Sequence, residues 1–337
     1  MTKKIAILGL GRIGRMHAEI LSHRIDGIDV TLLFDAYEQS AQSVGTQLNI
    51  PVASSLDEVF DSNVDAVAIC TSTDTHAELV IASAEAGKAI FLEKPVSLHL
   101  PDVDRALAAV SSASVPLQVG FNRRFDPAHA AVQQAVASGQ VGEVQLVKIT
   151  SRDPQPPPIE YVKVSGGIFL DMMIHDFDMA RFVVGSEVVQ VYATAAVRVD
   201  PAIGEVGDAD TAVVVLTHED GTITSIDNSR QAVYGYDQRV EVFGSKGMAR
   251  SENPRRHTAE IHSAEGTSLT PVPHFFLERY EESYVAEWRS FVAGLDSGEL
   301  PVTGADGRAP LVIGLAALES IRTKKPVDVS SIAVRTN

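Results

Sequence analysis

Two short segments carry residue types that could move a proton on a bound molecule. Asp171 and His175 stand four positions apart in a segment with helical spacing, and such residues lie on one face of a helix. The carboxylate can then accept a hydrogen bond from one ring nitrogen, which leaves the other nitrogen free to act as a base. In Glu93-Lys94-Pro95, the ammonium group of Lys94 could stabilise a developing alkoxide. We predict Lys94, Asp171 and His175 as the catalytic residues.

Taken singly, each of these signals has an ordinary structural explanation. An acid and a histidine four residues apart are often a helix-surface pair, and a lysine before a proline is usually a solvated loop charge. Asp178, three residues beyond His175, fits a supporting role or an ordinary ion pair equally well. A third motif raises the weight of the catalytic interpretation.

That motif is the glycine loop at residues 9–14, Gly-Leu-Gly-Arg-Ile-Gly. An apolar run at residues 4–8 comes before it and a helical pattern follows, which is the context that a dinucleotide-binding loop requires. The first glycine permits a tight turn, the second lets the backbone approach a pyrophosphate, and the third lets helix and strand pack closely. The predicted loop contacts with the cofactor are Gly9, Gly11, Arg12, Ile13 and Gly14.

Asp35 ends the next apolar run, at residues 29–34, about 20 residues past the third glycine, where an acidic residue meets the adenosine ribose. Because a carboxylate there repels a 2′-phosphate, the sequence favours NAD over NADP. The loop at residues 71–76 follows another apolar run, at residues 65–70. We expect this loop near the cofactor too, because ligands bind at the carboxyl ends of parallel strands. Its polar side chains could contact the cofactor or cap the following helix with equal weight. We assign Thr71, Ser72, Thr73 and His76 to the cofactor site, with Glu93 and Lys94.

Composition is that of a globular enzyme. The 337 residues suit two domains, 45% of them are hydrophobic, and no run of eighteen apolar residues could cross a membrane. A net charge of −16 argues against nucleic acids and anionic membranes as partners. The single cysteine, Cys70, gives neither an intrachain disulfide nor a cysteine-based metal site, and a strand starts too early for a signal peptide. We expect a cytoplasmic protein without a bound metal.

Hydrophobic patterning predicts an α/β fold in two parts. Residues 1–120 alternate strands with helices, which predicts a doubly wound parallel (Rossmann) sheet; its strands are expected near 4–8, 29–34, 65–70, 88–92 and 116–120. Residues 121–337 predict a second domain with a large, mainly antiparallel open sheet, and the C-terminal helices could pack back on the first domain. We expect its helices near 126–138, 168–184, 277–295 and 305–323, its strands near 143–151, 188–199, 210–218, 222–231 and 238–243, and a loop at Pro154–Pro158.

Together, the glycine loop, Glu93-Lys94-Pro95, Gly166-Gly167 before Asp171 and His175, and the strand-rich second half resemble the Gfo/Idh/MocA oxidoreductases. The resemblance covers essentially the whole chain. Within the family, the segments 151–154, 174–181 and 234–239 are most similar to those of the myo-inositol 2-dehydrogenases. Membership implies a cis Lys94–Pro95 bond, catalysis by Lys94, Asp171 and His175, and a homotetramer that buries the open sheet.

The resemblance implies an NAD-dependent oxidation of a ring alcohol to a 2-keto-inositol, in inositol catabolism. A cyclic polyol needs several hydrogen-bonding groups around it, and the candidates are Asn122, Arg123, Arg152, Asp153 and Tyr236. Ser151 and Asp153 replace a histidine and an asparagine that some inositol dehydrogenases carry, which leaves the preferred isomer open. The alternatives are a dehydrogenase of scyllo-inositol or glucose, and a non-catalytic nucleotide-binding regulator of the same fold.

Overall fold

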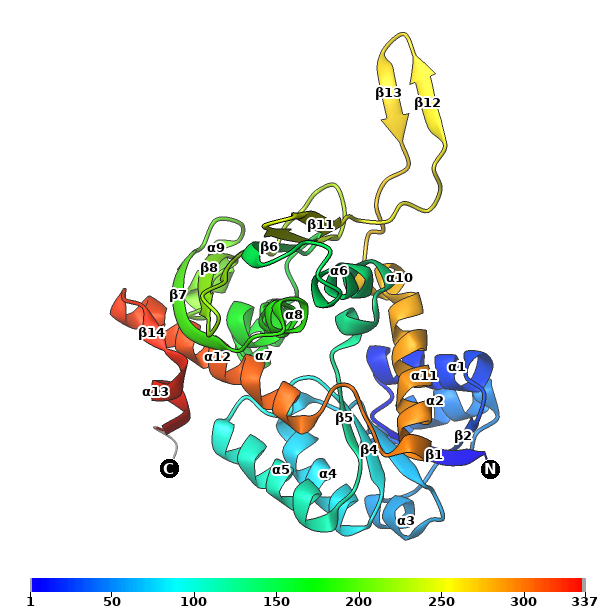
Figure 1. The fold of residues 1–337 in the computed structure, drawn as a ribbon. Helices are drawn as coiled ribbons and strands as arrows, with labels where there is room; N and C mark the ends of the chain where they lie inside the picture. The colour runs from blue at the N-terminus through cyan, green and yellow to red at the C-terminus, as the bar shows by residue number, and fades with distance from the viewer. Residues whose placement is uncertain (1, 335–337) are drawn as a thin grey trace. The chain divides into compact units, whose positions relative to one another are not determined.

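A computed structural model describes residues 2–334, so the outermost ends of both expected domains lie outside the described residues. The chain divides into two compact units (Figure 1). The first unit combines Met1–Asn122 with Glu282–Leu311, and the second combines Arg123–Glu281 with Val312–Asn337. Within the described residues, no helix is both long enough and apolar enough to cross a membrane.

The first unit contains a five-stranded, fully parallel sheet in the order β2-β1-β3-β4-β5, which confirms the predicted doubly wound fold. The apolar runs become strands because their side chains are buried on both faces of the sheet. The strand order reverses between β1 and β3, and ligands bind at that point in such sheets. The strands are β1 (Lys3–Leu8), β2 (Ile28–Phe34), β3 (Ala66–Ile69), β4 (Ala89–Glu93) and β5 (Leu117–Gly120). The helices are α1 (Arg12–Arg24), α2 (Glu38–Leu48), α3 (Leu56–Asp61), α4 (Thr73–Glu85), α5 (Leu100–Ala113) and α11 (Glu281–Ser297).

The second unit is built on a seven-stranded sheet in the order β11-β10-β6-β9-β8-β7-β14. Only the β6–β9 pair is parallel, so the prediction of a mainly antiparallel sheet is confirmed. Side chains alternate along the strands: Val214 and Leu216 are buried, whereas Val213 and Val215 face outward. The strands are β6 (Val144–Arg152), β7 (Val188–Ala196), β8 (Thr211–His218), β9 (Ile223–Ser229), β10 (Asp237–Gly244), β11 (Gly247–Ser251) and β14 (Val327–Asp328).

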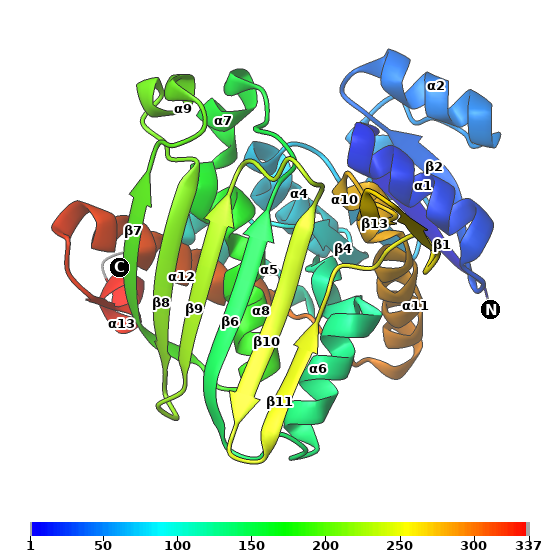
Figure 2. The same cartoon turned by 90° about the horizontal axis from the view of Figure 1, so that it is seen from above.

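Helices of the same unit cover one face of this sheet and leave the other open (Figure 2). Helix α6 packs against β10 and β11, and helix α8 packs against β6. The helical elements are η1 (Asn122–Phe125), α6 (Pro127–Ala137), α7 (Ile159–Ser165), η2 (Ile168–Met172), α8 (Ile174–Val184), α9 (Pro201–Glu205), α10 (Phe276–Arg279), α12 (Gly304–Thr323) and α13 (Val329–Val334). Helix α12 runs from the first unit into the second.

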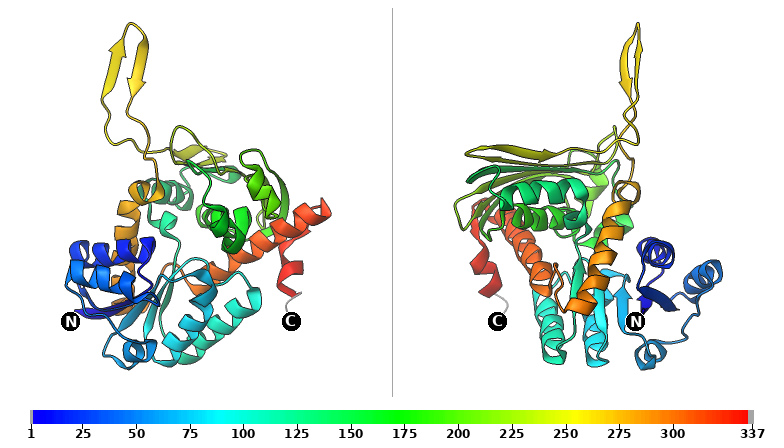
Figure 3. Two further views of the ribbon diagram at one scale, coloured as in Figure 1. Left: turned by 180° about the vertical axis from the view of Figure 1, so that it is seen from behind. Right: turned by 45° about the vertical axis from the view of Figure 1, so that its right-hand side comes forward.

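The structure departs from the sequence-based expectations in several places; the short elements α7, α9, β11, β14 and α13 were not expected, and the helix expected at 277–295 is divided into α10 and α11. A continuous helix over residues 168–184 is wrong: a π-helical turn, η2, ends at Met172, and α8 starts at Ile174. A hairpin of β12 (Glu260–Ser263) and β13 (Gly266–Leu269) was not expected; all of its strand residues are exposed, and it extends away from the sheet of its own unit (Figure 3). The proline-rich loop forms as expected, and α7 begins directly after Pro158.

Candidate active site

The glycine loop joins β1 to α1 in the first unit, and each of its three positions favours glycine for a different physical reason. Gly9 has φ +87°, a left-handed conformation that side chains disfavour. A Cβ on Gly14 would lie 1.8 Å from the Gly9 carbonyl oxygen, so the helix can approach the strand only at a glycine. Gly11, by contrast, precedes α1 with ordinary backbone angles, and a Cβ there would meet no atom within 4 Å. The open space over Gly11 and the N–H groups at the N-terminus of α1 fit a pyrophosphate.

Asp35 follows β2, and backbone N–H groups hold its carboxylate in place. Leu10 N–H donates to Oδ2 at 2.6 Å and Tyr37 N–H donates to Oδ1 at 2.8 Å. The first bond comes from the glycine loop itself, so the loop and the acidic residue are fixed together. A carboxylate has about four acceptor sites, which leaves capacity for ribose hydroxyls.

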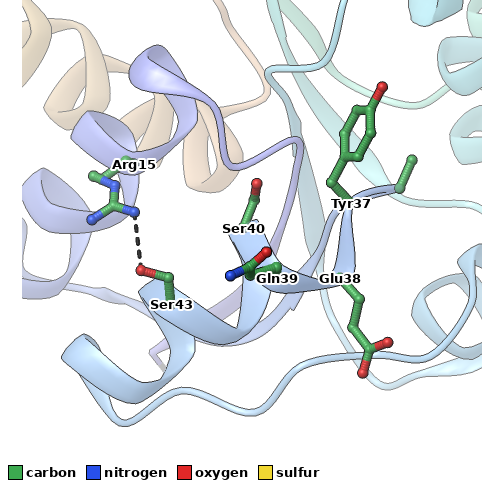
Figure 4. Close-up of a pocket in the computed structure, with 7 residues that line it drawn as sticks. Arg15, Tyr37, Glu38, Gln39, Ser40 and Ser43 are labelled. Carbon is green, nitrogen blue, oxygen red and sulfur yellow. Dashed lines mark hydrogen bonds between the residues drawn. The ribbon is translucent and has the colours of Figure 1, made fainter.

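A pocket of about 650 Å³ opens beside the residues that follow Asp35 (Figure 4). Arg15 from α1 points across it and donates from Nη2 to Ser43 Oγ at 3.3 Å. The lining is polar, with one guanidinium, and it suits the adenosine end of a dinucleotide. The lining residues are Arg15, Ala36, Tyr37, Glu38, Gln39, Ser40 and Ser43.

Replacing Asp35 with serine should shift the cofactor preference towards NADP. The substitution removes the charge that repels a 2′-phosphate and leaves the Arg15 guanidinium in the adjoining pocket. The ratio of kcat/KM for NADP to that for NAD should rise by about tenfold or more, as loss of one close charge repulsion predicts. Steady-state kinetics with both cofactors measure this ratio.

Two companion variants separate charge from geometry. Asp35→Asn keeps an oxygen that can accept from Leu10 N–H, so it should show most of the shift. Adding Arg15→Ala to Asp35→Ser should abolish the gain in NADP use. A ratio that is the same in wild type and Asp35→Ser would place the cofactor preference elsewhere.

The loop after β3 leads into α4, which begins at Thr73. Ser72 occupies the position before the helix, but its side chain makes no capping hydrogen bond there. His76 is buried, with Nδ1 2.7 Å from the Pro95 carbonyl oxygen and Nε2 3.1 Å from that of Thr71. This geometry favours a structural role for His76, because its ring ties the Thr71 loop to the loop after β4. Cofactor contacts of Thr71, Ser72, Thr73 and His76 stay predictions.

Lys94 directly follows β4, so it emerges at the carboxyl edge of the parallel sheet, and the Lys94–Pro95 bond is cis as expected. Glu93 is anchored by a chain of buried side chains. Trp288 Nε1–H donates to His17 Nδ1 at 2.8 Å, so the His17 proton sits on Nε2 and is donated to Glu93 Oε1 at 2.7 Å. Glu93, the residue before Lys94, is therefore held in place by His17 and Trp288.

Asp171 and His175 lie in the second unit on different elements, Asp171 in the π-helical turn η2 and His175 in the first turn of α8. The spacing argument assumed one regular α-helix and is corrected in this respect. Tyr161 from α7 donates its hydroxyl hydrogen to Asp171 Oδ1 at 3.0 Å. The Asp171 carboxylate thus has a second element fixing its orientation.

The start of η2 explains the paired glycines before Asp171. Gly167 has φ +71°, and a Cβ there would lie 2.5 Å from Asp208 Oδ1. The same oxygen accepts a hydrogen bond from Ile168 N–H at 3.1 Å. Asp208 therefore occupies the space that a glycine leaves and fixes the turn that carries Asp171.

Two predicted substrate residues are engaged in ion pairs within the second unit. Arg123 is buried and donates to Asp176 Oδ1 at 2.7 Å and to Tyr236 Oη at 3.3 Å. Arg152 donates through Nε to Asp227 Oδ1 at 3.1 Å. These pairs favour a supporting role for both guanidinium groups over direct substrate contact.

The remaining polar candidates are buried or half-buried. Tyr236 is buried, and burial raises the pKa of its hydroxyl, so the group stays protonated. Burial also raises the pKa of Asp153 to about 6, against the opposing effect of Arg230. Asn122 is buried at the end of the first unit. Asp178 accepts two hydrogen bonds from Arg124, at 2.8 and 2.6 Å, as an ion-pair partner would. Substrate contacts of Asn122, Asp153 and Tyr236 stay predictions.

Several residues that shape the site carried no recognisable sequence signal. They act on it from distant parts of the chain, so no local spacing could reveal them. They are Arg15 at the adenosine pocket, His17 and Trp288 beneath Glu93, and Tyr161, Asp208 and Arg230 around Asp171.

The chain belongs to the Gfo/Idh/MocA oxidoreductase family. Residues 3–121 match the model of the oxidoreductase family with an NAD-binding Rossmann fold, and residues 129–250 match the GFO/IDH/MocA C-terminal domain. The cofactor is therefore NAD, as the glycine loop and Asp35 predict.

Individual relatives match over nearly the full length. The myo-inositol 2-dehydrogenase of Thermotoga maritima is 47% identical over 332 residues, which are 98% of this chain and 99% of the relative. The crystal structure of a myo-inositol dehydrogenase from Corynebacterium glutamicum has a TM-score of 0.93 and 38% identity, covering 97% of this chain and 99% of that one. A scyllo-inositol dehydrogenase from Lactobacillus casei, solved with NAD(H) and scyllo-inositol, has a TM-score of 0.91 and 28% identity, covering 98% and 100%.

Proposed function

We propose that this protein is an NAD-dependent myo-inositol 2-dehydrogenase in inositol catabolism. The observation that carries the proposal is the placement of its proton-handling groups. Lys94 stands at the carboxyl edge of a nucleotide-binding sheet, and in the second unit Asp171 lies in η2 and His175 in the first turn of α8. Full-length relatives named as inositol dehydrogenases support the substrate class.

The proposed reaction removes two hydrogens from a ring CH–OH group, one from the carbon and one from the hydroxyl oxygen. A bound NAD would supply the acceptor for the carbon-bound hydrogen, which leaves as hydride. His175 takes the hydroxyl proton, for which an imidazole is suited near neutral pH. Asp171 orients the ring and stabilises the imidazolium as it forms, and the Lys94 ammonium stabilises the oxygen as its negative charge develops. The products are a 2-keto-inositol, NADH and one proton.

A polyol panel tests the substrate. Purified protein with NAD should produce NADH from myo-inositol with the highest kcat/KM in a panel that includes scyllo-inositol and glucose. Absorbance of NADH at saturating NAD measures the rates. A glucose or scyllo-inositol rate equal to the myo-inositol rate would transfer the assignment to that substrate. NAD binding without turnover on any polyol would favour a non-catalytic regulator.

We also propose that the open sheet face is covered in a homotetramer. One cross-strand row on this face is apolar and about half exposed: Met248, Phe243, Leu146 and Ile223 are direct neighbours at 48%, 48%, 47% and 45% exposure. A contiguous apolar surface of this kind is typical of an interaction site, and most homo-oligomers are closed and symmetric. The native mass in solution tests this. A cytoplasmic location stays a prediction that rests on the single cysteine.

A further inference from the structure

A buried arginine lies beside the proposed catalytic carboxylate. Arg230 follows β9 and is only 1% exposed. Its Nη2 lies 3.8 Å from Asp171 Oδ2 and also 3.8 Å from Asp208 Oδ2. One guanidinium therefore contacts both the proposed catalytic acid, Asp171, and Asp208, the acid that fixes the turn carrying Asp171.

The contact is one of charge and not of hydrogen bonding. A separation of 3.8 Å is too long for a hydrogen bond. Within residues 2–334, the buried Nε and Nη2 atoms of Arg230 have no hydrogen-bond partner, and neither does the buried Oδ2 of Asp208. Burying a cation with so few hydrogen bonds contributes little to stability. What Arg230 supplies to its surroundings is a fixed positive charge.

Several other charged or titratable groups of the second unit lie around Asp171. Tyr161 from α7 donates a hydrogen bond to it. Asp153, after β6, has a pKa raised to about 6, chiefly by burial, and Asp171 raises that pKa further while Arg230 lowers it. Arg123 and Asp176 act on Asp153 with opposite signs. Arg230 is thus the cation that contacts Asp171 most directly among these groups.

We infer that Arg230 is a positioning residue for the reaction: its charge orients the Asp171 carboxylate, and through Asp171 it sets the proton affinity of His175. Asp208 opposes this effect, because its negative charge lies at the same distance from the Arg230 guanidinium and offsets part of the positive charge. This inference rests on the proposed roles of Asp171 and His175.

The first test compares two replacements of Arg230 by the pH profile of kcat/KM. Arg230→Met keeps an unbranched apolar stem but removes the charge, so the imidazolium becomes easier to form. Wild-type kcat/KM should rise with pH along a limb that follows the loss of the His175 proton. In Arg230→Met this limb should move to higher pH by roughly one unit, and kcat should fall more than KM changes. Arg230→Lys keeps a point charge, which is all that a 3.8 Å contact uses, and should return the limb close to its wild-type position.

The second test uses the opposing acid and guards against a failure of Arg230→Met to fold. Asp208→Asn keeps an oxygen that accepts from Ile168 N–H but removes a negative charge next to Arg230. The guanidinium then acts more strongly on Asp171 and His175, so the limb should move to lower pH. Opposite shifts in these two variants are not expected from damage to the fold, which lowers kcat/KM at every pH.

Thermal unfolding and NAD affinity establish that each variant is folded. A limb that stays at the wild-type pH in folded Arg230→Met and Asp208→Asn would overturn the inference while the proposed function stands. Failure of the proposed function looks different: the wild-type protein would lack activity on inositol, or its limb would persist in His175→Ala. Arg230→Lys that behaves like Arg230→Met would also contradict the inference, because charge alone would not explain the effect.

Discussion

His175→Ala should lower kcat by a factor of about 10²–10⁴ and leave the affinity for NAD nearly unchanged. Loss of a general base has an effect of this size. The nucleotide loop lies in the other unit of the chain, so it is untouched by the substitution. Wild-type kcat/KM should rise with pH as His175 loses its proton, and this limb should be absent in the variant. Steady-state assays across pH measure kcat and kcat/KM, and a fluorescence titration with NAD measures the affinity for the cofactor.

Related variants test the roles of the partners. Asp171→Asn should give a smaller but still large loss of kcat, because the imidazole remains but its orientation and charge stabilisation are weakened. Lys94→Ala should lower kcat through loss of alkoxide stabilisation. His262→Ala, on the exposed hairpin strand β12, is a matched control that should keep the wild-type profile. If His175→Ala kept both wild-type turnover and the limb, the base would be another group, with Lys94 or Asp178 next to examine.

Two glycines of the same loop should respond in opposite ways to alanine. At Gly14 a methyl group would be forced against the Gly9 carbonyl oxygen, so Gly14→Ala should destabilise the first unit. Overpacking of this kind costs about 1–3 kcal/mol or more, which corresponds to a fall in Tm of several degrees. At Gly11 a methyl group meets no protein atom, so Gly11→Ala should keep the wild-type Tm.

Gly11→Ala should instead weaken NAD binding, by about tenfold or more in Kd, because the methyl group occupies the approach of the pyrophosphate. Thermal unfolding without cofactor and isothermal titration with NAD separate the two effects. Unchanged NAD affinity in Gly11→Ala would show that the pyrophosphate does not pass over this residue. An unchanged Tm in Gly14→Ala would mean that α1 can move away from β1 without loss.

The sequence predicted those elements most accurately whose structure depends on a local residue pattern. All five strands of the first sheet were placed within one residue or so, because buried parallel strands are continuous apolar runs between turns. The glycine loop and Asp35 were recognisable because their spacing follows directly from strand-turn-helix geometry. The lysine at the end of β4 was found for the same reason.

Features that depend on distant residues escaped prediction. The π-helical turn at Asp171 is fixed by Asp208. Asp208 is distant in the sequence and comes close to the turn only when the chain folds, so the local helical pattern could not reveal it. Arg230 likewise appears in the sequence as one charge at the end of a strand. The hairpin at residues 260–269 is exposed throughout and mostly polar, with Ile261 and Leu269 as its only large apolar residues, so it lacks the one-sided apolar alternation that marks a strand.

The pairing of His17 with Trp288, 271 residues apart, has a consequence for how the chain folds during synthesis. Trp288 is fully buried and its ring stacks on that of Phe91 at a centroid distance of 4.1 Å, with Phe291 edge-on to both. When the ribosome has made only the first 122 residues, the hydrophobic side of Phe91 still lacks these partners. The nucleotide-binding unit therefore matures only after the entire intervening sheet has emerged. A nascent chain paused before α11 should be a substrate for chaperones and proteases, whereas one released after it should resist both.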